Sequence, residues 1–203
     1  MLTFDVETTK LDGYKNHVTC FPKPMLTFDV ETTGLDGYRN HVTCFCCHDS
    51  VTNEQRSFVF DQPPLSEDTL RKQAEVTFLL DTAETLCAFN GAKFDLPFMA
   101  KSWKVPDHVL GTWVAKLVDV FEASRLSIKT TFKLNDLLAA NGLSSKTGSG
   151  LEAIRLAEQG QWEELAHYCM QDVLLTYAVT TKSVVNLPKT HLKWSMDKGF
   201  LTS

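Results

Sequence analysis

Two carboxylates in one short segment are the first residues of the sequence that could bind a metal ion. Asp29 and Glu31 stand at the end of an apolar run and are separated by one residue. On a β-strand, residues two apart point to the same face, so the two carboxylates are expected to converge. Carboxylates held close together repel each other unless a cation neutralises them. Their hard oxygen donors suit Mg²⁺ or Mn²⁺, and the spacing therefore predicts part of a divalent-metal site.

Two further acidic residues lie in settings that favour the same site. Asp95 follows a predicted buried strand and stands at the expected start of a helix, where by itself it would serve as an N-cap. Asp172 lies in a long C-terminal helical pattern, beside an apolar stripe, and shares a helix face with Tyr168 four positions earlier. A carboxylate near an apolar stripe needs a partner, which a metal ion or the tyrosine hydroxyl could provide.

The segment that carries the first carboxylate pair occurs twice. Residues 1–21 and 25–45 differ at only two of 21 positions. The second copy continues directly into the following strand pattern, whereas Pro22–Pro24 interrupts the chain after the first. Lys10 also stands where the second copy has Gly34, which we expect to adopt a positive φ at a turn.

We therefore predict that Asp29 and Glu31 are functional and that Asp5 and Glu7 are redundant. The first copy could be disordered, could add an edge strand, or could replace the equivalent strand of a neighbouring molecule and so support a dimer. The predicted organisation is an N-terminal appendage at 1–24, a catalytic domain at 25–187 and a C-terminal tail at 188–203.

The apolar patterns around these residues predict an α/β fold. Three strands, at 26–31, 41–47 and 56–60, are expected to form an antiparallel meander. Alternating helices and strands follow: helices at 66–80, 94–105, 133–140, 150–158 and 162–185, and strands at 85–89 and 117–120. We therefore predict a mixed sheet, with three antiparallel strands and then parallel strands, flanked by helices. This is the ribonuclease-H-like pattern, which strand counting alone does not single out.

Composition fits a single domain without a membrane partner. The chain has 203 residues, of which 43% are hydrophobic, and no apolar run approaches the ~20 residues that span a bilayer. We expect a soluble, intracellular protein, cytoplasmic in a prokaryote. The net charge of −5 argues against nucleic-acid binding. This argument is weak, because metal-binding carboxylates would contribute to the negative charge.

The six cysteines do not have the spacing of a zinc site. Cys44, Cys46 and Cys47 gather before His48, but structural zinc sites usually require a second ligand pair downstream. We interpret these cysteines as small apolar residues of a buried strand.

Taken together, the motifs DxETTGL, NxxxFDxP and YCxxDV resemble those of the DEDD superfamily of 3′–5′ exonucleases. The resemblance covers roughly Met25 to Val185, and is strongest to the exonuclease domains of family-B DNA polymerases and their stand-alone relatives. All four acidic positions of the pattern are filled, by Asp29, Glu31, Asp95 and Asp172. The resemblance implies hydrolysis of DNA from the 3′ end by two divalent cations, Mg²⁺ or Mn²⁺, with release of nucleoside 5′-monophosphates.

The resemblance also implies roles for other residues. One branch of the family orients the attacking water with a Tyr four positions before the last Asp, and another uses a His five positions before it. This chain has both, as Tyr168 and His167. On an unbroken helix Tyr168 lies within about 40° of Asp172, whereas His167 lies about 140° away, so we predict the Tyr branch. Residues expected to line the substrate are Thr33, Gly34, Leu35, Asn90 and Phe94.

The expected substrates are single-stranded DNA and the 3′ ends of duplex DNA. RNA stays open, because no motif reports on the sugar 2′-hydroxyl. The alternatives are an exoribonuclease of the ribonuclease D type and a nucleic-acid-binding module without catalysis, although the complete acidic set argues against the latter. Lysines that could contact phosphates are Lys93, Lys101, Lys104, Lys129, Lys133 and Lys146.

Overall fold

A five-stranded mixed sheet forms the centre of the computed structural model, which describes residues 24–122, 131–146, 150–182, 184–188, 193–195 and 200–202. The strand order is β3-β2-β1-β4-β5. The pairs β1/β2 and β2/β3 are antiparallel, whereas β1/β4 and β4/β5 are parallel, as predicted. The strand bounds are β1 Met25–Thr32, β2 Val42–Asp49, β3 Gln55–Val59, β4 Thr85–Ala88 and β5 Leu117–Asp119. The first copy of the repeat, residues 1–23, lies outside the described residues.

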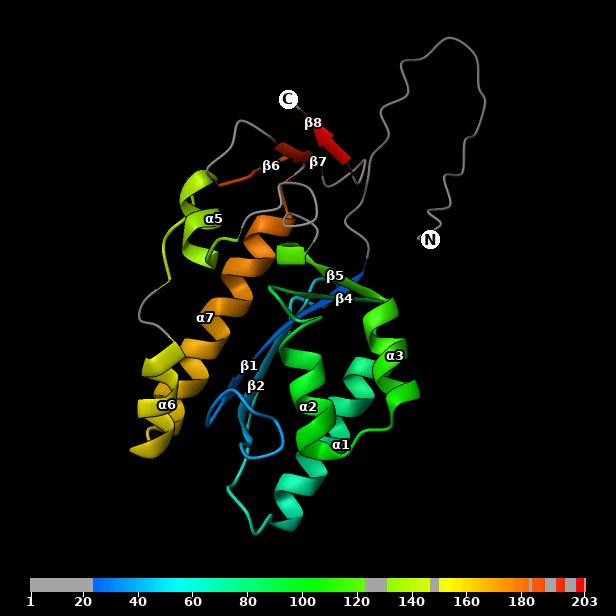
Figure 1. The fold of residues 1–203 in the computed structure, drawn as a ribbon, viewed down its shortest axis with the longest axis vertical. Coiled ribbons are helices and arrows are strands. Elements are labelled where there is room, and N and C mark those ends of the chain that lie inside the picture. Colours follow the sequence, from blue (N-terminus) through cyan, green and yellow to red (C-terminus); the bar gives the residue numbers. More distant parts are fainter. Residues whose placement is uncertain are drawn as a thin grey trace.

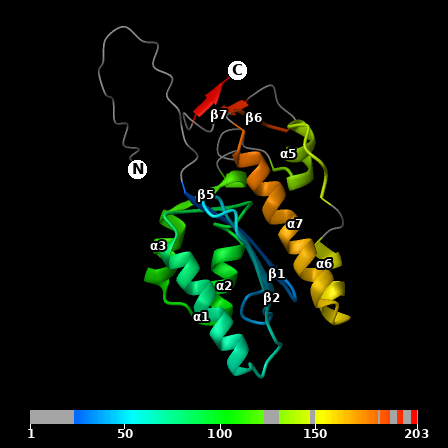
Figure 2. The same cartoon turned by 180° about the vertical axis from the view of Figure 1, so that it is seen from behind.

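Helices cover both faces of this sheet (Figure 1; Figure 2 gives the reverse view). One face carries α1 Glu67–Thr82, α2 Asp95–Trp103 and α3 Asp107–Ala115. The other carries α5 Leu134–Ala140, α6 Gly150–Glu158 and α7 Trp162–Thr180, with α7 lying along β1 and β2. No helix in the described part of the chain is long and apolar enough to cross a membrane.

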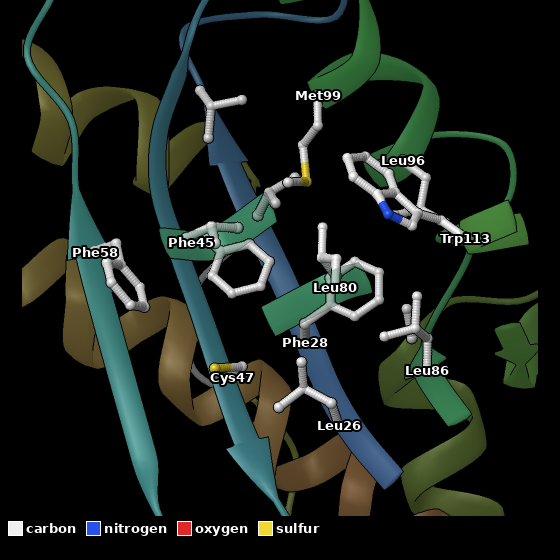
Figure 3. Close-up of a cluster of buried hydrophobic side chains, with 14 of the residues drawn as sticks. Leu26, Phe28, Phe45, Cys47, Phe58, Leu80, Leu86, Leu96, Met99 and Trp113 are labelled. Atoms are coloured by element: carbon white, nitrogen blue, oxygen red, sulfur yellow. The ribbon is translucent and has the colours of Figure 1, made fainter. Parts of the chain in front are cut away.

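The alternation of residues along β1 decides what each face contains. Leu26, Phe28 and Val30 enter the main apolar core, which they share with residues of α1, α2 and α3 (Figure 3). Phe28 stacks on Phe45 of β2, with ring centroids 5.7 Å apart. The intervening positions of β1 belong to the opposite face, because successive side chains of a strand alternate. Asp29 is one of them, and it therefore lies on the side of α7.

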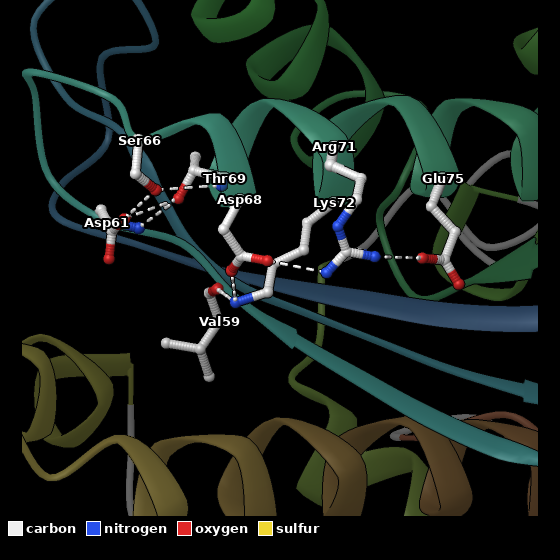
Figure 4. Close-up of polar contacts among 8 residues, drawn as sticks. All are labelled: Val59, Asp61, Ser66, Asp68, Thr69, Arg71, Lys72 and Glu75. Atoms are coloured by element: carbon white, nitrogen blue, oxygen red, sulfur yellow. Dashed lines mark hydrogen bonds and ion pairs between the residues drawn. The ribbon is translucent and has the colours of Figure 1, made fainter.

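Ser66 caps the N-terminus of α1. Ser66 Oγ accepts a hydrogen bond from Thr69 N at 3.1 Å. Asp61 accepts hydrogen bonds from the side-chain hydroxyls of Ser66 and Thr69 (Figure 4). One turn later, Lys72 Nζ pairs with Asp68 at 2.7 Å. These contacts fix the start of α1 against the end of β3 and so anchor one helix of the main core.

The C-terminal part of the chain differs from the predicted pattern. The last long helix ends at Thr180, not Val185, and β6 (Val184–Asn186) follows. It forms a separate three-stranded sheet with β7 (Lys193–Ser195) and β8 (Phe200–Thr202). The physical reason is tertiary: Asn141 donates to Asn186 O at 2.9 Å and accepts from Asn186 N at 2.8 Å. Helix α3 was also not predicted.

Candidate active site

Four carboxylates from three separate segments share one site. Asp29 and Glu31 come from β1, Asp95 from the first turn of α2, and Asp172 from α7. Oxygen atoms of Asp29 and Glu31 and the Sγ of Cys169 lie within 4.8 Å of one another. The remaining carboxylates are close enough for their charges to act directly on Asp29. The predicted acidic residues are therefore brought together by the fold.

Asp95 reaches the site because the turn between β4 and α2 is held at both ends. Val30 N donates to Asp95 Oδ1 at 3.2 Å, which fixes the carboxylate against β1. Asn90, with φ of 70°, begins the turn that leads into α2. Asp119, at the end of β5, accepts hydrogen bonds from Asn90 N at 3.0 Å and from Ala92 N at 2.9 Å.

Asp119 is a buried residue that sequence reasoning missed. Besides the β4–α2 turn, it binds the backbone N–H groups of Phe121 and Glu122, both at 3.0 Å. Its position after an apolar strand was the available signal, because acidic residues at the ends of neighbouring parallel strands meet at one edge of a sheet. Asp119 thus joins β5 to the turn that positions Asp95.

Helix α7 directs Tyr168 and Asp172 to the same side. Both are buried, whereas His167 is exposed. The Tyr168 hydroxyl and Asp172 Oδ1 are buried polar atoms for which the described residues offer no close hydrogen-bond partner. Asp172 Oδ2 is paired with Lys146 Nζ at 2.5 Å, and this ammonium lies 5.2 Å from the centre of the Tyr168 ring.

The carboxylates bind protons more tightly than free acids do. Burial is the largest cause that raises the pKa of Asp29, followed by the charges of Asp95 and Glu31. Burial raises the pKa of Glu31 to about 8, with help from the charge of Asp172. Burial likewise raises the pKa of Asp95 to about 7.

Lys146 compensates only part of this charge. Burial raises the pKa of Asp172 as well, and the Lys146 ammonium opposes that rise. In return, burial disfavours the charge on Lys146, but its ion pair with Asp172 outweighs burial and raises its pKa. Among the described residues one ammonium faces four carboxylates, so their ionised forms carry an excess of negative charge.

Comparison with known proteins identifies the family. A family model described as the RNase_H superfamily matches residues 26–184. The chain belongs to the RNase_H superfamily. A search of the curated proteins gave no match. One solved structure that this RNase H superfamily chain resembles is the family B DNA polymerase from the hyperthermophilic archaeon Pyrobaculum calidifontis, with a TM-score of 0.61 and 16% identity. The match covers 79% of this chain and 24% of the polymerase chain, and it shows a shared fold.

The donor set of this RNase H superfamily site fits a divalent cation. Asp29 and Glu31 offer oxygens close to each other, and Asp172 Oδ1 is a buried acceptor without a partner. Hard carboxylate oxygens are the ligands that Mg²⁺ and Mn²⁺ prefer. A cation would also relieve the repulsion that raises the carboxylate pKa values.

The loop after β1 differs in one respect from the prediction. Gly34 does not have a positive φ, so that expectation was wrong. A Cβ atom at this position would instead lie 2.7 Å from Asn40 Oδ1, and close packing is therefore the reason for glycine. Thr33 N donates to His41 O at 3.0 Å, which closes the loop. Leu35 projects outward with 85% of its surface exposed.

The other residues predicted to line the substrate are partly buried. Asn90 lies in the turn described above, and Phe94 precedes α2 with its ring 5.6 Å from that of Phe98. Of the predicted lysines, Lys146 lies in the site itself. Lys93 is paired with Glu122 at 2.8 Å and Lys101 lies over the ring of Tyr38. Lys129 lies outside the described residues.

Proposed function

We propose that the protein is a metal-dependent 3′–5′ exonuclease that acts on DNA, prefers single-stranded 3′ ends and releases nucleoside 5′-monophosphates. The observation that carries the proposal is the convergence of four carboxylates, three of them buried and Asp29 half-buried, beside the buried Tyr168 hydroxyl, which has no hydrogen-bond partner among the described residues. Membership of the RNase H superfamily supports a nuclease. The likeness to a DNA polymerase and the sequence motifs support the 3′–5′ direction and DNA as substrate.

The carboxylates would hold two cations, Mg²⁺ or Mn²⁺. Asp29, Glu31 and Asp172 would bind the first, while Asp29 and Asp95 would bind the second. Such ions stabilise the attacking and leaving oxygens of a phosphodiester and make hydroxide available near neutral pH. The hydrogen bond that Val30 N donates to Asp95 restrains the Asp95 carboxylate, which therefore remains directed toward the site.

Tyr168 would orient the attacking water. Among the described residues its buried hydroxyl makes no close hydrogen bond, although the Lys146 ammonium interacts with it, so a water molecule is a suitable partner. Burial raises the pKa of Tyr168 to about 12, and the phenol therefore stays protonated during turnover. It can position water through a hydrogen bond, but it is not the base.

The substrate would enter along the loop after β1. The exposed side chain of Leu35 offers an apolar surface to the 3′-terminal base, and Thr33 and Gly34 bring the backbone close to it. Phe94 and Asn90 would border the same place from the turn before α2. Lys146 supplies positive charge beside the carboxylates, where a phosphate would otherwise meet only negative charge.

The direct test uses single-stranded DNA and RNA of one sequence, each labelled at the 5′ end. We expect Mn²⁺ to support stepwise shortening of the DNA, EDTA to stop it, and a blocked 3′ end to prevent it. Faster shortening of the RNA would show an exoribonuclease. Internal cleavage of 3′-blocked DNA would show an endonuclease, and binding without degradation would show a non-catalytic module.

The choice between the two copies of the repeat is tested by matched double variants. We predict that Asp29→Ala with Glu31→Ala abolishes hydrolysis, because it removes half of the carboxylates. The equivalent change, Asp5→Ala with Glu7→Ala, should leave the rate within about twofold. The opposite result would place the first copy in the sheet. Gel filtration of a variant without residues 1–24 tests whether the appendage supports a dimer.

A further inference from the structure

Three buried cysteines lie directly behind the carboxylate site. Cys44 and Cys46 are two apart on β2 and therefore share a face, and Cys169 approaches them from α7. All three are free thiols with no exposed surface. Their Sγ atoms lie within 4.8 Å of one another, and those of Cys44 and Cys46 are 3.7 Å apart.

The separation of Cys44 Sγ and Cys46 Sγ matches that of two sulfur ligands around one metal ion, and Cys169 Sγ lies within 4.8 Å of both. Zinc binds thiolate at about 2.3 Å, so two sulfurs of a tetrahedral site lie roughly 3.8 Å apart. Three thiolates also select thiophilic ions over Mg²⁺ or Mn²⁺. The remaining two cysteines of the described residues, Cys47 and Cys87, are equally buried but belong to no such group.

The cysteine group is in contact with the carboxylate site through Cys169. Its Sγ lies 3.5 Å from Asp29 O and 3.9 Å from Asp29 Oδ2. The strand register gives the same relation, since Asp29 is paired with Cys46 and Glu31 with Cys44. A ligand of the sulfur group would therefore lie within reach of a carboxylate that the proposed hydrolysis requires.

We propose that Cys44, Cys46 and Cys169 form a binding site for one thiophilic cation such as Zn²⁺. The Asp29 carboxylate is grouped with Cys169 but not with Cys44 and Cys46, so it becomes the fourth donor by moving toward the sulfurs. Binding replaces the thiol protons, which pass to the buffer as the sulfurs become thiolate ligands. An ion held there draws Asp29 away from the hard cations, so it inhibits hydrolysis. This inhibitory effect rests on the proposed exonuclease function, whereas the binding itself does not.

Burial sets the kinetics of the site. Because the three sulfurs lie between β2 and α7 without access to solvent, an ion can enter only when these elements separate transiently. Cys46 also contacts Ser57 Oγ at 3.2 Å and Ala166 O at 3.4 Å, and these contacts must yield to the ion. We therefore expect slow loading, and titrations need long equilibration.

The binding test uses the full chain with Cys20→Ser, which removes the one cysteine outside the described residues. The reduced, metal-free protein is titrated with Cd²⁺, and thiolate-to-cadmium absorption in the ultraviolet is followed. We expect one Cd²⁺ per chain, displaced by Zn²⁺ but not by Mg²⁺. Cys46→Ala and Cys169→Ala should each weaken binding by more than about tenfold. Cys47→Ala and Cys87→Ala are the matched controls and should bind as the parent does.

Folding of each variant is checked by circular dichroism, and Cys46→Ser provides a second variant of nearly the same volume. Absence of the absorption band, or its persistence in both Cys46 variants and in Cys169→Ala, would overturn the site.

Inhibition is measured separately: equimolar Zn²⁺ should slow Mn²⁺-supported hydrolysis in the parent and not in Cys46→Ala. Equal inhibition of both would overturn the shared role of Asp29. A parent that binds Cd²⁺ but hydrolyses nothing would refute the exonuclease and leave the sulfur site standing.

Discussion

Lys146 is the residue that opposes the rise that burial causes in the pKa of Asp172. The Lys146 and Asp172 side chains form a close ion pair in a largely buried setting. In the described part of the chain, the other three carboxylates have no equivalent ion pair with a lysine. Asp172 is thus the carboxylate of the four that has a direct ion pair with a lysine in the described part of the chain.

The neighbouring residues Tyr168 and His167 give a prediction at this scale. We expect Tyr168→Phe to lower the hydrolysis rate by about 10²-fold, because the change removes the hydroxyl that would orient water. His167→Ala should stay within about twofold, since this side chain is exposed and points away from Asp172. Rates under saturating Mn²⁺ give the comparison, with unfolding measured to exclude damage to the fold. A larger loss in His167→Ala than in Tyr168→Phe would contradict it.

Sequence reasoning finds residues best when a local pattern carries them. Asp29, Glu31, Asp95 and Asp172 stand in motifs with recognisable spacing, and the structure brings these four together. Contacts between distant segments are different. Cys169 lies 123 residues after Cys46, and no spacing in the chain announces that the two sulfurs meet.

At the scale of elements, the turn between β4 and α2 is the part on which the site most depends. Asp119 satisfies four backbone N–H groups from two segments, and one of these segments delivers Asp95. Backbone N–H groups that are buried without a partner are costly. The position of Asp95 therefore depends on a carboxylate at the end of a different strand.

We predict that Asp119→Asn lowers both stability and hydrolysis. An amide places N–H groups against backbone N–H donors, so at least one donor loses its acceptor. The expected cost is about 3 kcal/mol in the free energy of unfolding. Urea unfolding measures it, and Asp107→Asn, at the exposed start of α3, is the matched control with an expected cost below about 1 kcal/mol. Equal effects in the two variants would show that Asp119 does not hold the turn.

The elements that the sequence predicted and missed differ in what forms them. The strands of the main sheet have local apolar patterns, and the Ser66 cap has a local signature. The end of α7 has neither, because Val185 continues an apolar helical pattern but lies in β6, which pairs with β7 and is held by the contacts of Asn141 with Asn186. Tertiary hydrogen bonds therefore override the local periodicity there.

At the scale of the whole molecule, the buried carboxylates couple stability to pH and to metal ions. A fold normally avoids gathering like charges, yet this one brings together four acidic side chains, three of them buried and Asp29 half-buried. The cost is tolerable only if the charges are neutralised by protons, by Lys146 or by bound cations. Which of these dominates changes with pH.

We predict that the metal-free protein loses stability as pH rises from about 5.5 to 8. The pKa of Glu31 is raised to about 8 and that of Asp95 to about 7, so the folded state holds protons that the unfolded chain releases. Stability from such groups is complete below their unfolded pKa values and is lost as pH rises through the folded ones. Thermal unfolding in EDTA at several pH values measures this slope.

Mn²⁺ should reverse the loss. Because the ion binds the ionised carboxylates of the folded state alone, it should raise the melting temperature by several degrees at pH 8 and by little at pH 5.5. The matched variant is Asp29→Asn with Glu31→Gln, which replaces two charges by neutral groups of similar shape. In EDTA at pH 8 we expect it to be more stable than the parent, and to gain nothing from Mn²⁺. A flat pH profile for the parent, or equal Mn²⁺ shifts at both pH values, would show that the carboxylates do not form the metal-binding group.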